Sequence, residues 1–458
     1  MDEKPDEEEK QDYWIRWLPG ALKRRVENSP TLQKIIQNAG WLVSERVGIM
    51  AIRFFVGVWV VRYLGPDNYG VYSYAVSLAA LSKPISSLGL NQVVIRECSR
   101  DKYPNDLVLS TAFWMRGIAA VVVVSIIAVM IYSIEDDWIT KLVVLIISGQ
   151  ILFDTLLVSD QWFQSQLQSK YSVYARTVAV VVSSALKIIA VVAGSSVVVF
   201  AIILLVQSAI QATGFGIALR SLGPQFSQFS PSVSIASKLF KNSWPLMIAA
   251  FSTMIYMKID QVMMKNMVGE NEVGVYASAV KVSELWYFLP TAIASSVFPE
   301  VVRSREKLSY KEYMGKIQTF YDSMAALAYA VTIPVTFLAP YIVLFLFGEA
   351  YSDAGPILQI HVWSFIFIAL GVARGKWLVA ENLVKHAMFA TLIGALSNIG
   401  LNFFLIPRAG AEGAAWATLI SYVLYSYVSL LVSTDTRIAF KQLSKAIVLP
   451  FRFNSFNN

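Results

Sequence analysis

Long runs of apolar residues, separated by short polar stretches, dominate the chain. A helix needs roughly twenty apolar residues to cross a bilayer, and about twelve runs reach that length. The strands of a membrane barrel would be about ten residues long and would alternate polar with apolar positions, which these runs do not. The pattern therefore predicts an all-α, polytopic membrane protein with about twelve transmembrane helices, near residues 39–63, 70–92, 107–133, 139–161, 172–193, 196–219, 240–266, 273–300, 318–347, 355–379, 384–406 and 412–433.

A polar turn between the first two spans recurs between the seventh and eighth. When residues 64–76 are aligned with residues 268–280 without a gap, six positions are identical. Such self-similarity indicates an internal duplication, and two halves in the same order predict a pseudo-twofold axis along the membrane normal. The matching residues are Gly65 with Gly269, Gly70 with Gly274, Val71 and Tyr72 with Val275 and Tyr276, and Ala75 and Val76 with Ala279 and Val280.

The duplication divides the chain into two six-helix lobes. A connection rich in Pro, Ser and Gln separates them, and such a composition marks a break. The predicted units are a cytoplasmic tail, an N-terminal lobe with spans 1 to 6, a linker, a C-terminal lobe with spans 7 to 12, and a second cytoplasmic tail, at residues 1–38, 39–220, 221–239, 240–433 and 434–458. Residues 12–27 mix Trp and Leu with Arg and Lys, which is typical of a helix in the membrane interface. A merely basic flank to the first span explains them equally well.

Composition agrees with a protein buried mostly in lipid. Of the 458 residues, 56% are hydrophobic and 15% are charged, and the mean hydropathy is +0.55. A soluble domain carries roughly 25% charged residues. The class of soluble globular proteins is therefore excluded.

The placement of charge predicts the orientation. The net charge is +7, and Lys and Arg gather in the two tails and in every second connection, whereas Asp and Glu dominate the other connections. The positive-inside rule then predicts an even number of spans with both termini cytoplasmic, in a cytoplasmic (inner) membrane. This explains the net charge without a nucleic-acid partner.

The sequence carries no motif of catalytic chemistry. No P-loop, dinucleotide fingerprint, nucleophile elbow or zinc spacing is present. Cys98 is the single cysteine, so no disulfide is expected. We therefore expect no enzyme activity, no cofactor and no metal.

Ionisable side chains in the middle of spans are costly in lipid, so each is a candidate functional residue. Cations outnumber anions among them, and so many cations cannot all face lipid. This predicts a water-filled, net-positive cavity between the halves, which suits an anionic substrate and above all a phosphate. The substrate-binding candidates are Arg46, Arg53, Lys83, Arg116, Lys258, Lys281, Arg374 and Lys376. The ion-coupling candidates are Asp154, Asp260, Glu284 and Asp322.

Structural roles explain some of the same residues. Lys281 and Glu284 lie three positions apart and could pair within one helix. Lys187 and Lys376 could lie near enough to span ends to extend toward the interface. His361, isolated beside Trp363, is more typical of a packed histidine than of a proton relay.

Five strings, each weak alone, are specific as a set: Arg62–Pro66 (RYLGP), Ser87–Leu90 (SLGL), Tyr256–Gln261 (YMKIDQ), Ser283–Phe288 (SELWYF) and Gly371–Trp377 (GVARGKW). Together they resemble the bacterial O-antigen and exopolysaccharide flippases called Wzx. These belong to the multidrug/oligosaccharidyl-lipid/polysaccharide (MOP) exporter superfamily. The resemblance covers nearly everything from residue 29 to about residue 433.

The resemblance implies two six-helix lobes in a V, as in MATE and MurJ proteins. It also implies alternating access and translocation of an undecaprenyl-pyrophosphate-linked oligosaccharide to the outer leaflet. The expected partners are that lipid-linked oligosaccharide, membrane lipid, and the polysaccharide polymerase and chain-length machinery. Proton or sodium coupling is a further expectation.

Three alternatives stay open. A MATE-type cation-coupled drug antiporter shares the architecture but would need an acidic cavity. A lipid II flippase is a nearer alternative than the MATE-type antiporter. A membrane polysaccharide polymerase or ligase would handle the same substrate, although such enzymes usually carry a large external loop, and every external connection here is short.

Overall fold

The computed structural model describes residues 30–100, 102–223 and 231–448, and every regular element within these ranges is a helix. Ten of the described helical segments are long and apolar enough to cross a membrane. Two of these, Gly48–Ser86 and Lys385–Leu431, contain a break in helical geometry at Gly65 and at Gly410. Each of the two therefore folds as a pair of spans, and the predicted all-α fold with about twelve spans is confirmed.

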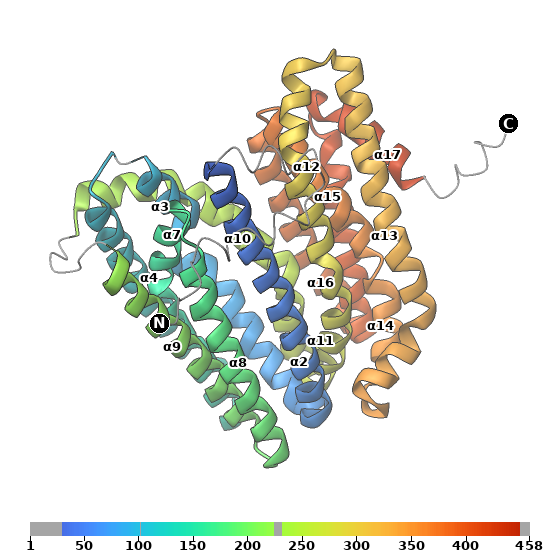
Figure 1. Cartoon of the computed structure of the whole chain (residues 1–458). Coiled ribbons are helices and arrows are strands. Elements are labelled where there is room, and N and C mark those ends of the chain that lie inside the picture. Colours follow the sequence, from blue (N-terminus) through green and yellow to red (C-terminus); the bar gives the residue numbers. More distant parts are fainter. Residues whose placement is uncertain (1–29, 101, 224–230, 449–458) are drawn as a thin grey trace, which may run out of the picture.

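The helices up to residue 222 form one bundle, the N-lobe (Figure 1). The first helix begins at Pro30, where proline suits the first helical position because its missing N–H would be unbonded anyway. The described elements of the N-lobe are α2 (Pro30–Ser86), α3 (Leu90–Ser99), α4 (Asn105–Ile134), α5 (Trp138–Ser148), α6 (Gln150–Phe153), η2 (Asp154–Leu156), α7 (Leu157–Ser165), α8 (Lys170–Val192) and α9 (Val197–Leu222). The fourth predicted span is thus the broken run from α5 to α7.

The helices from residue 233 onward form the second bundle, the C-lobe (Figure 1). Its elements are α10 (Val233–Val268), α11 (Glu270–Glu284), η4 (Leu285–Tyr287), α12 (Phe288–Lys307), α13 (Tyr310–Phe347), η5 (Glu349–Tyr351), α14 (Ala354–His361), α15 (Ser364–Ala380), α16 (Val384–Ser426), η6 (Val428–Leu431), η7 (Thr434–Thr436) and α17 (Arg437–Ile447). Helix α10 starts within the predicted linker because Ser232 caps it, its side chain accepting from the Ile235 N–H. Helix α17 lies in the predicted C-terminal tail and packs on α13, where Gln442 donates to the Met314 carbonyl at 2.8 Å.

Reciprocal contacts show that the two halves are related by pseudo-symmetry. Gly70 packs directly against the backbone carbonyl of Glu270, and Gly274 packs in the same way against the carbonyl of Pro66. In the alignment of the two repeats Pro66 is equivalent to Glu270, and Gly70 to Gly274. Only glycine lets the backbones approach so closely.

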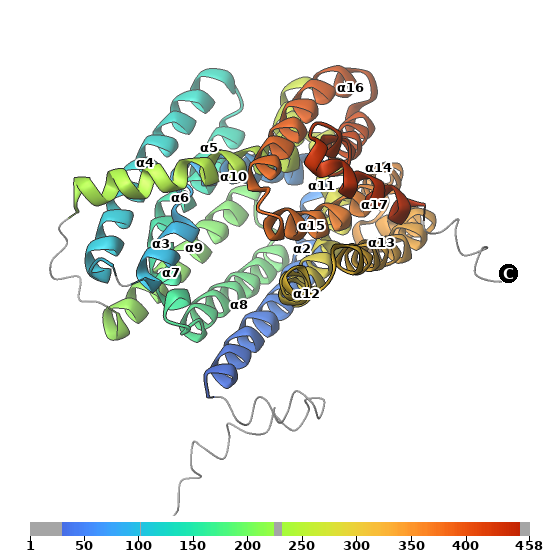
Figure 2. The same ribbon diagram turned by 90° about the horizontal axis from the view of Figure 1, so that it is seen from above.

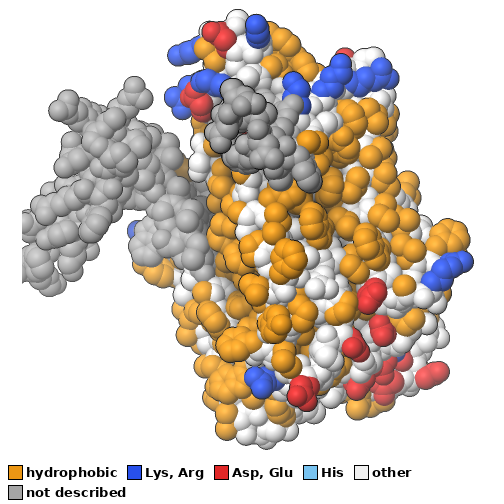
Figure 3. Space-filling model, turned by 90° about the vertical axis from the view of Figure 1, so that its right-hand side faces the viewer, with side chains coloured by type: hydrophobic (Ala, Val, Ile, Leu, Met, Phe, Trp, Pro, Cys, Tyr) orange, Lys and Arg blue, Asp and Glu red, His pale blue; other side chains and the backbone are white. Residues whose placement is uncertain are grey.

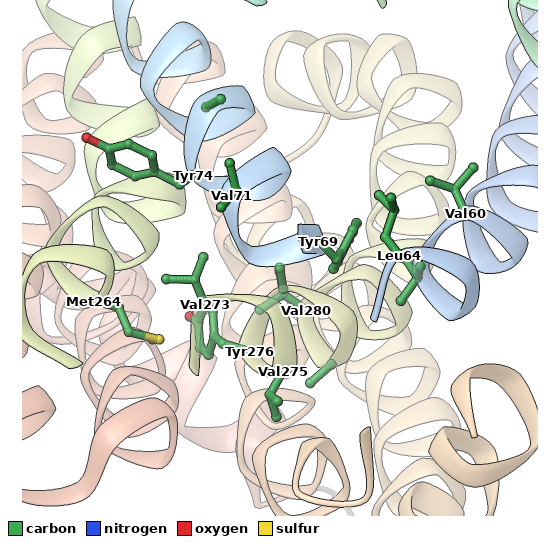
Figure 4. Close-up of a cluster of buried hydrophobic side chains, with 14 of the residues drawn as sticks. Val60, Leu64, Tyr69, Val71, Tyr74, Met264, Val273, Val275, Tyr276 and Val280 are labelled. Carbon is green, nitrogen blue, oxygen red and sulfur yellow. The ribbon is translucent and has the colours of Figure 1, made fainter. Parts of the chain in front are cut away.

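The lobes meet at the end of the molecule where α2 and α11 lie, at the bottom of Figure 1. There the Asn271 side chain donates to Asp67 at 2.9 Å, and these two residues are also equivalent in the repeats. A buried apolar cluster lies at the same junction, with Val60 and Tyr74 from α2, Met264 from α10 and Tyr276 from α11 (Figure 4).

Helix α10 connects the lobes on a second side. Figure 2 shows it running from beside α3 and α4 toward the C-lobe. Near its start, Lys238 donates to the Tyr103 hydroxyl at 2.7 Å, and this hydrogen bond lowers the pKa of Tyr103. The Ser232 N–H donates to the Thr111 hydroxyl at 3.1 Å. Its later turns pack on α16.

Alanine substitution should show what the two matching turns require. Gly65 has φ 69° and ψ 170°, and Gly269 has φ 96° and ψ 175°, a region open essentially to glycine alone. We expect Gly65→Ala or Gly269→Ala to lower the free energy of unfolding by roughly 1 to 3 kcal/mol, measured by thermal unfolding in detergent. Gly216→Ala, in the helical α9 with open space around it, is the matched control and should be nearly neutral. Unfolding that is unchanged in both turn variants would contradict the prediction.

Candidate functional site

Two adjoining cavities lie along the inner side of the N-lobe. The first, which we call the N-lobe cavity, has a volume of about 460 Å³ and is lined by α2, α6, α8 and α9 with one residue from α11. The second, the inter-lobe cavity, has about 560 Å³ and lies between α2, α3, α4 and α6 of the N-lobe and α10 of the C-lobe. Lys83, Asp154 and Leu157 line both cavities, so the two adjoin each other.

The charged residues that line these cavities are mostly basic. Five cations face one carboxylate, Asp154, among the described lining residues. The cations come from four different helices, and they are Arg53 and Lys83 of α2, Arg116 of α4, Lys187 of α8 and Lys281 of α11. Four of the predicted substrate-binding residues, Arg53, Lys83, Arg116 and Lys281, are therefore brought together.

Lys281 reaches from the C-lobe into the N-lobe. Its ammonium lies over Gly57 of α2, where a Cβ would come within 2.5 Å of the nitrogen. It also lies 5.9 Å from the centre of the Tyr69 ring, and among the described residues no carboxylate forms an ion pair with it. The proposed pairing with Glu284 within one helix is not observed, and the Lys281 charge faces the cavity instead.

Two cavity cations have polar partners in the N-lobe. The Lys83 ammonium lies 3.1 Å from the Asp154 carboxylate and 3.4 Å from the side-chain oxygen of Gln150. Arg116 is buried and donates to the Asn91 side chain. Asp154, which pairs with Lys83, is the single carboxylate among the described lining residues, so the described lining is net positive.

Three charged candidates of the C-lobe have partners within that lobe. Lys258 lies 3.0 Å from Glu284 on the neighbouring helix. Asp260 is buried and accepts from the Tyr276 hydroxyl and from the Thr418 hydroxyl. Neither group lines the two cavities.

Two further candidates, Lys376 and Asp322, do not line these two cavities. Lys376 lies over the Phe298 ring, with its nitrogen 4.9 Å from the ring centre. Asp322 accepts from Gln318 at 2.8 Å on α13. Arg46 belongs to α2, but its side chain lies outside the described residues.

Arg374 is held inside the C-lobe. It is 1% exposed, donates to the Tyr425 carbonyl at 2.6 Å and to the Ser429 hydroxyl at 3.1 Å, and stacks on the Tyr425 ring at 4.7 Å. These bonds join α15 to α16 and η6.

Arg374→Ala should therefore act on stability. Loss of its hydrogen bonds should lower the free energy of unfolding by roughly 1 to 3 kcal/mol, measured by thermal unfolding in detergent. Arg374→Lys keeps one donor and should lose less. If Arg374→Ala unfolds like the wild type but binds substrate poorly, the packing role is wrong.

Sequence reasoning interpreted Lys187 as a residue near a span end and left it out of the binding set, and it missed a group of neutral polar side chains. Lys187 follows Ser183 by four residues and Ser184 by three, so the three side chains share one face of α8 and line the N-lobe cavity. Gln207 and Gln211 are also four apart on the apolar α9 and face the same cavity. Polar residues at helical spacing on two successive spans were the available signal.

Together these groups give the two cavities a lining whose described charges are mostly positive. Arg binds phosphate oxygens through two parallel hydrogen bonds and Lys binds them as a point charge. A group with several negative oxygens can contact cations from separate helices at the same time, whereas a single carboxylate contacts fewer of them.

Solved structures show the same fold. The structure of the lipid II flippase MurJ in an inward closed conformation matches with a TM-score of 0.71 and 15% identity, over 91% of this chain and 92% of that chain. An inward-facing multidrug resistance MATE family transporter of the MOP superfamily matches with a TM-score of 0.67 and 16% identity, over 87% of this chain and 96% of that chain. At these identities the two matches show that this chain shares their fold.

The family follows from the sequence comparisons. The chain belongs to the polysaccharide biosynthesis protein family, whose model matches residues 35–305, and the lipid II flippase MurJ model matches residues 240–450. The probable low-salt glycan biosynthesis flippase Agl15 of Haloferax volcanii is 27% identical over 198 residues, which are 42% of this chain and 41% of that protein. The chain thus spans about two fifths of the length of this curated relative.

Proposed function

We propose that the protein is a non-enzymatic flippase that moves a diphosphate-linked oligosaccharide across the cytoplasmic membrane. The lipid carrier is undecaprenyl pyrophosphate, and the saccharide is a repeat unit of an O-antigen or exopolysaccharide. The translocated lipid then serves the polysaccharide polymerase and chain-length machinery.

The observation that carries this proposal is the charge of the two adjoining cavities, where five cations face one carboxylate. Cations within a membrane-spanning region are costly, so a net-positive lining favours a ligand that brings several negative oxygens. A diphosphate supplies them, while its saccharide enters the hydrated space and its polyprenyl chain stays in lipid.

The relatives support this class of substrate. Agl15 is named as a probable glycan biosynthesis flippase, and MurJ as a lipid II flippase. The MurJ match over residues 240–450 makes lipid II a second candidate substrate. A cation-coupled drug antiporter is disfavoured, because a positive cavity repels cationic drugs.

Alternating access requires two lobes that can separate at either end. The lobes meet where α2 and α11 lie (Figure 1). Separation at this end would open the cavities toward the side of the membrane on which this end lies. Figure 3 shows Lys and Arg at one end of the C-lobe face and Asp and Glu at the other, with hydrophobic surface between. By the positive-inside rule, we propose that the basic end and both termini are cytoplasmic.

Four carboxylates stay candidates for ion coupling. Asp154 lines both cavities and pairs with Lys83, so protonation of Asp154 would free a cation for the substrate. Asp260, Glu284 and Asp322 bond within the C-lobe and would act through that lobe instead.

Reconstitution tests the proposal. Proteoliposomes carrying fluorescent undecaprenyl-diphosphate oligosaccharide or lipid II are followed by quenching of the outer leaflet, with and without a proton or sodium gradient. We expect protein-dependent flipping with chemically unchanged lipid recovered. Arg53→Ala should slow it at least tenfold, because a bond to a charged group contributes roughly 1.5 to 3 kcal/mol. The control is Arg305→Ala, whose side chain pairs with Glu381 away from the cavities. Equal flipping in protein-free liposomes would refute the proposal.

A further inference from the structure

Uncharged polar side chains cover one wall of the N-lobe cavity. Gln207 and Gln211 of α9, Ser184 of α8 and Gln150 of α6 all line this cavity, α8 packs against α9, and we call these four residues the polar wall. An amide in a membrane span is costly unless it finds hydrogen-bonding partners, and a diphosphate alone would be served by the cations. The wall therefore needs a ligand with neutral hydrogen-bonding groups.

Part of the bonding capacity of this wall is unused by the protein. Gln207 accepts through its side-chain oxygen from the Ser183 hydroxyl at 2.7 Å, and Gln150 accepts from Lys83 at 3.4 Å. In both, the amide N–H₂ group has no partner among the described residues. The Gln211 side chain makes no hydrogen bond to the described part of the chain. These donors point to a ligand rich in oxygen acceptors.

An aromatic surface lies beside the amides. Tyr69 and Tyr72 of α2 line the same cavity, and their rings are stacked, with centres 6.3 Å apart and an angle of 22° between planes. Binding pockets commonly combine such aromatic walls with a few placed polar groups that orient the ligand. A pyranose ring has this dual chemistry, with hydroxyls at its rim and C–H groups on its faces.

We infer that Gln207, Gln211, Ser184 and Tyr72 form a saccharide subsite for the sugar attached directly to the diphosphate. The inference rests on the proposed function, because the cations Lys187 and Lys281 line the same cavity and would hold the diphosphate beside this wall. With the exception of Lys281, every residue that lines the cavity belongs to the N-lobe. The N-lobe thus recognises the sugar attached to the diphosphate.

The test separates recognition of the sugar from recognition of the diphosphate. Purified protein in nanodiscs is titrated with four polyprenyl diphosphates. One carries no sugar, and the other three carry glucose, galactose or N-acetylglucosamine. The wild type should bind at least one sugar-bearing lipid more tightly than the bare lipid. Gln207→Leu combined with Gln211→Leu should weaken that sugar-bearing lipid about tenfold and leave the bare diphosphate unchanged, since each neutral hydrogen bond accounts for a few-fold in affinity.

Matched variants keep the result decisive. Lys187→Gln should weaken all four lipids alike, and Gln166→Leu, on an exposed position outside the cavity, should weaken none. Thermal unfolding of each variant checks the fold. The subsite is refuted if the double variant weakens bare and sugar-bearing lipids equally, or weakens neither. If the wild type binds none of the four lipids, the proposed function itself fails and the subsite with it.

Discussion

Lys281→Glu should lower the affinity for a polyprenyl diphosphate by about 100-fold or more. The substitution removes a charged hydrogen-bond donor, which contributes roughly 1.5 to 3 kcal/mol, and it adds a like charge facing the ligand. Two such losses reach roughly 3 kcal/mol or more, and each 1.4 kcal/mol is tenfold in affinity. The position is sensitive because Lys281 is the one lining residue of the N-lobe cavity that comes from the C-lobe.

The affinity is measured by titration of fluorescent polyprenyl diphosphate into nanodiscs. Lys281→Gln should lie between the wild type and Lys281→Glu, because it loses the charge without reversing it. The control is Lys316→Glu, whose side chain is exposed and pairs with Glu300, so only surface charge changes. Similar affinities for Lys281→Glu and Lys316→Glu would remove Lys281 from the site.

The fold could be predicted because a bilayer imposes length and polarity on each span. The structure also explains two of the aligned glycines, since Gly65 and Gly269 both adopt φ values that favour glycine. Helix starts were less predictable. Helix α10 begins at Val233, inside the predicted linker, because a single serine cap extends it beyond the apolar run.

The site could be predicted only in part, because sequence identifies a costly charge but not the direction in which its helix faces. In the sequence, Lys258 and Lys281 are both lysines within predicted spans, and both are predicted to bind substrate. In the structure Lys258 pairs with Glu284, while Lys281 reaches over Gly57 into the other lobe. That outcome depends on the rotation of α11 against α2, which is set by the close glycine contacts between the lobes.

The direction in which a helix faces also explains why the predicted binding residues omitted Lys187 and included Arg374. Lys187 lies nearer the end of its span in the sequence, where a lysine can extend to the interface, but the packing of α8 on α9 turns it toward Gln207 and Gln211 in the cavity. Arg374 lies in mid-span, yet its charge is met by a backbone carbonyl and an aromatic ring. A count of charged residues in the sequence cannot show that an arginine has a carbonyl or an aromatic ring as its partner.

Gly70→Ala and Gly274→Ala should each open the end of the molecule where the lobes meet. A Cβ on Gly70 would overlap the backbone carbonyl of Glu270, and one on Gly274 would overlap that of Pro66. Backbone atoms in packed helices cannot turn aside as a flexible side chain can, so the lobes must shift apart. We expect each substitution to cost about 3 kcal/mol, the upper part of the range for overpacking, and the two costs to be similar because the contacts are reciprocal.

Crosslinking reports this separation directly. Asp67→Cys and Asn271→Cys, introduced with Cys98→Ser, replace two residues whose side chains are hydrogen-bonded across the interface at 2.9 Å. A short bifunctional thiol reagent should join them in the parent protein and much less in either alanine variant, whose unfolding midpoint should also fall. Gly315→Ala, on α13 with open space around it, should crosslink like the parent. Because the two contacts are symmetric, a loss in one glycine variant with full crosslinking in the other would show that the pseudo-twofold interface does not hold the lobes together.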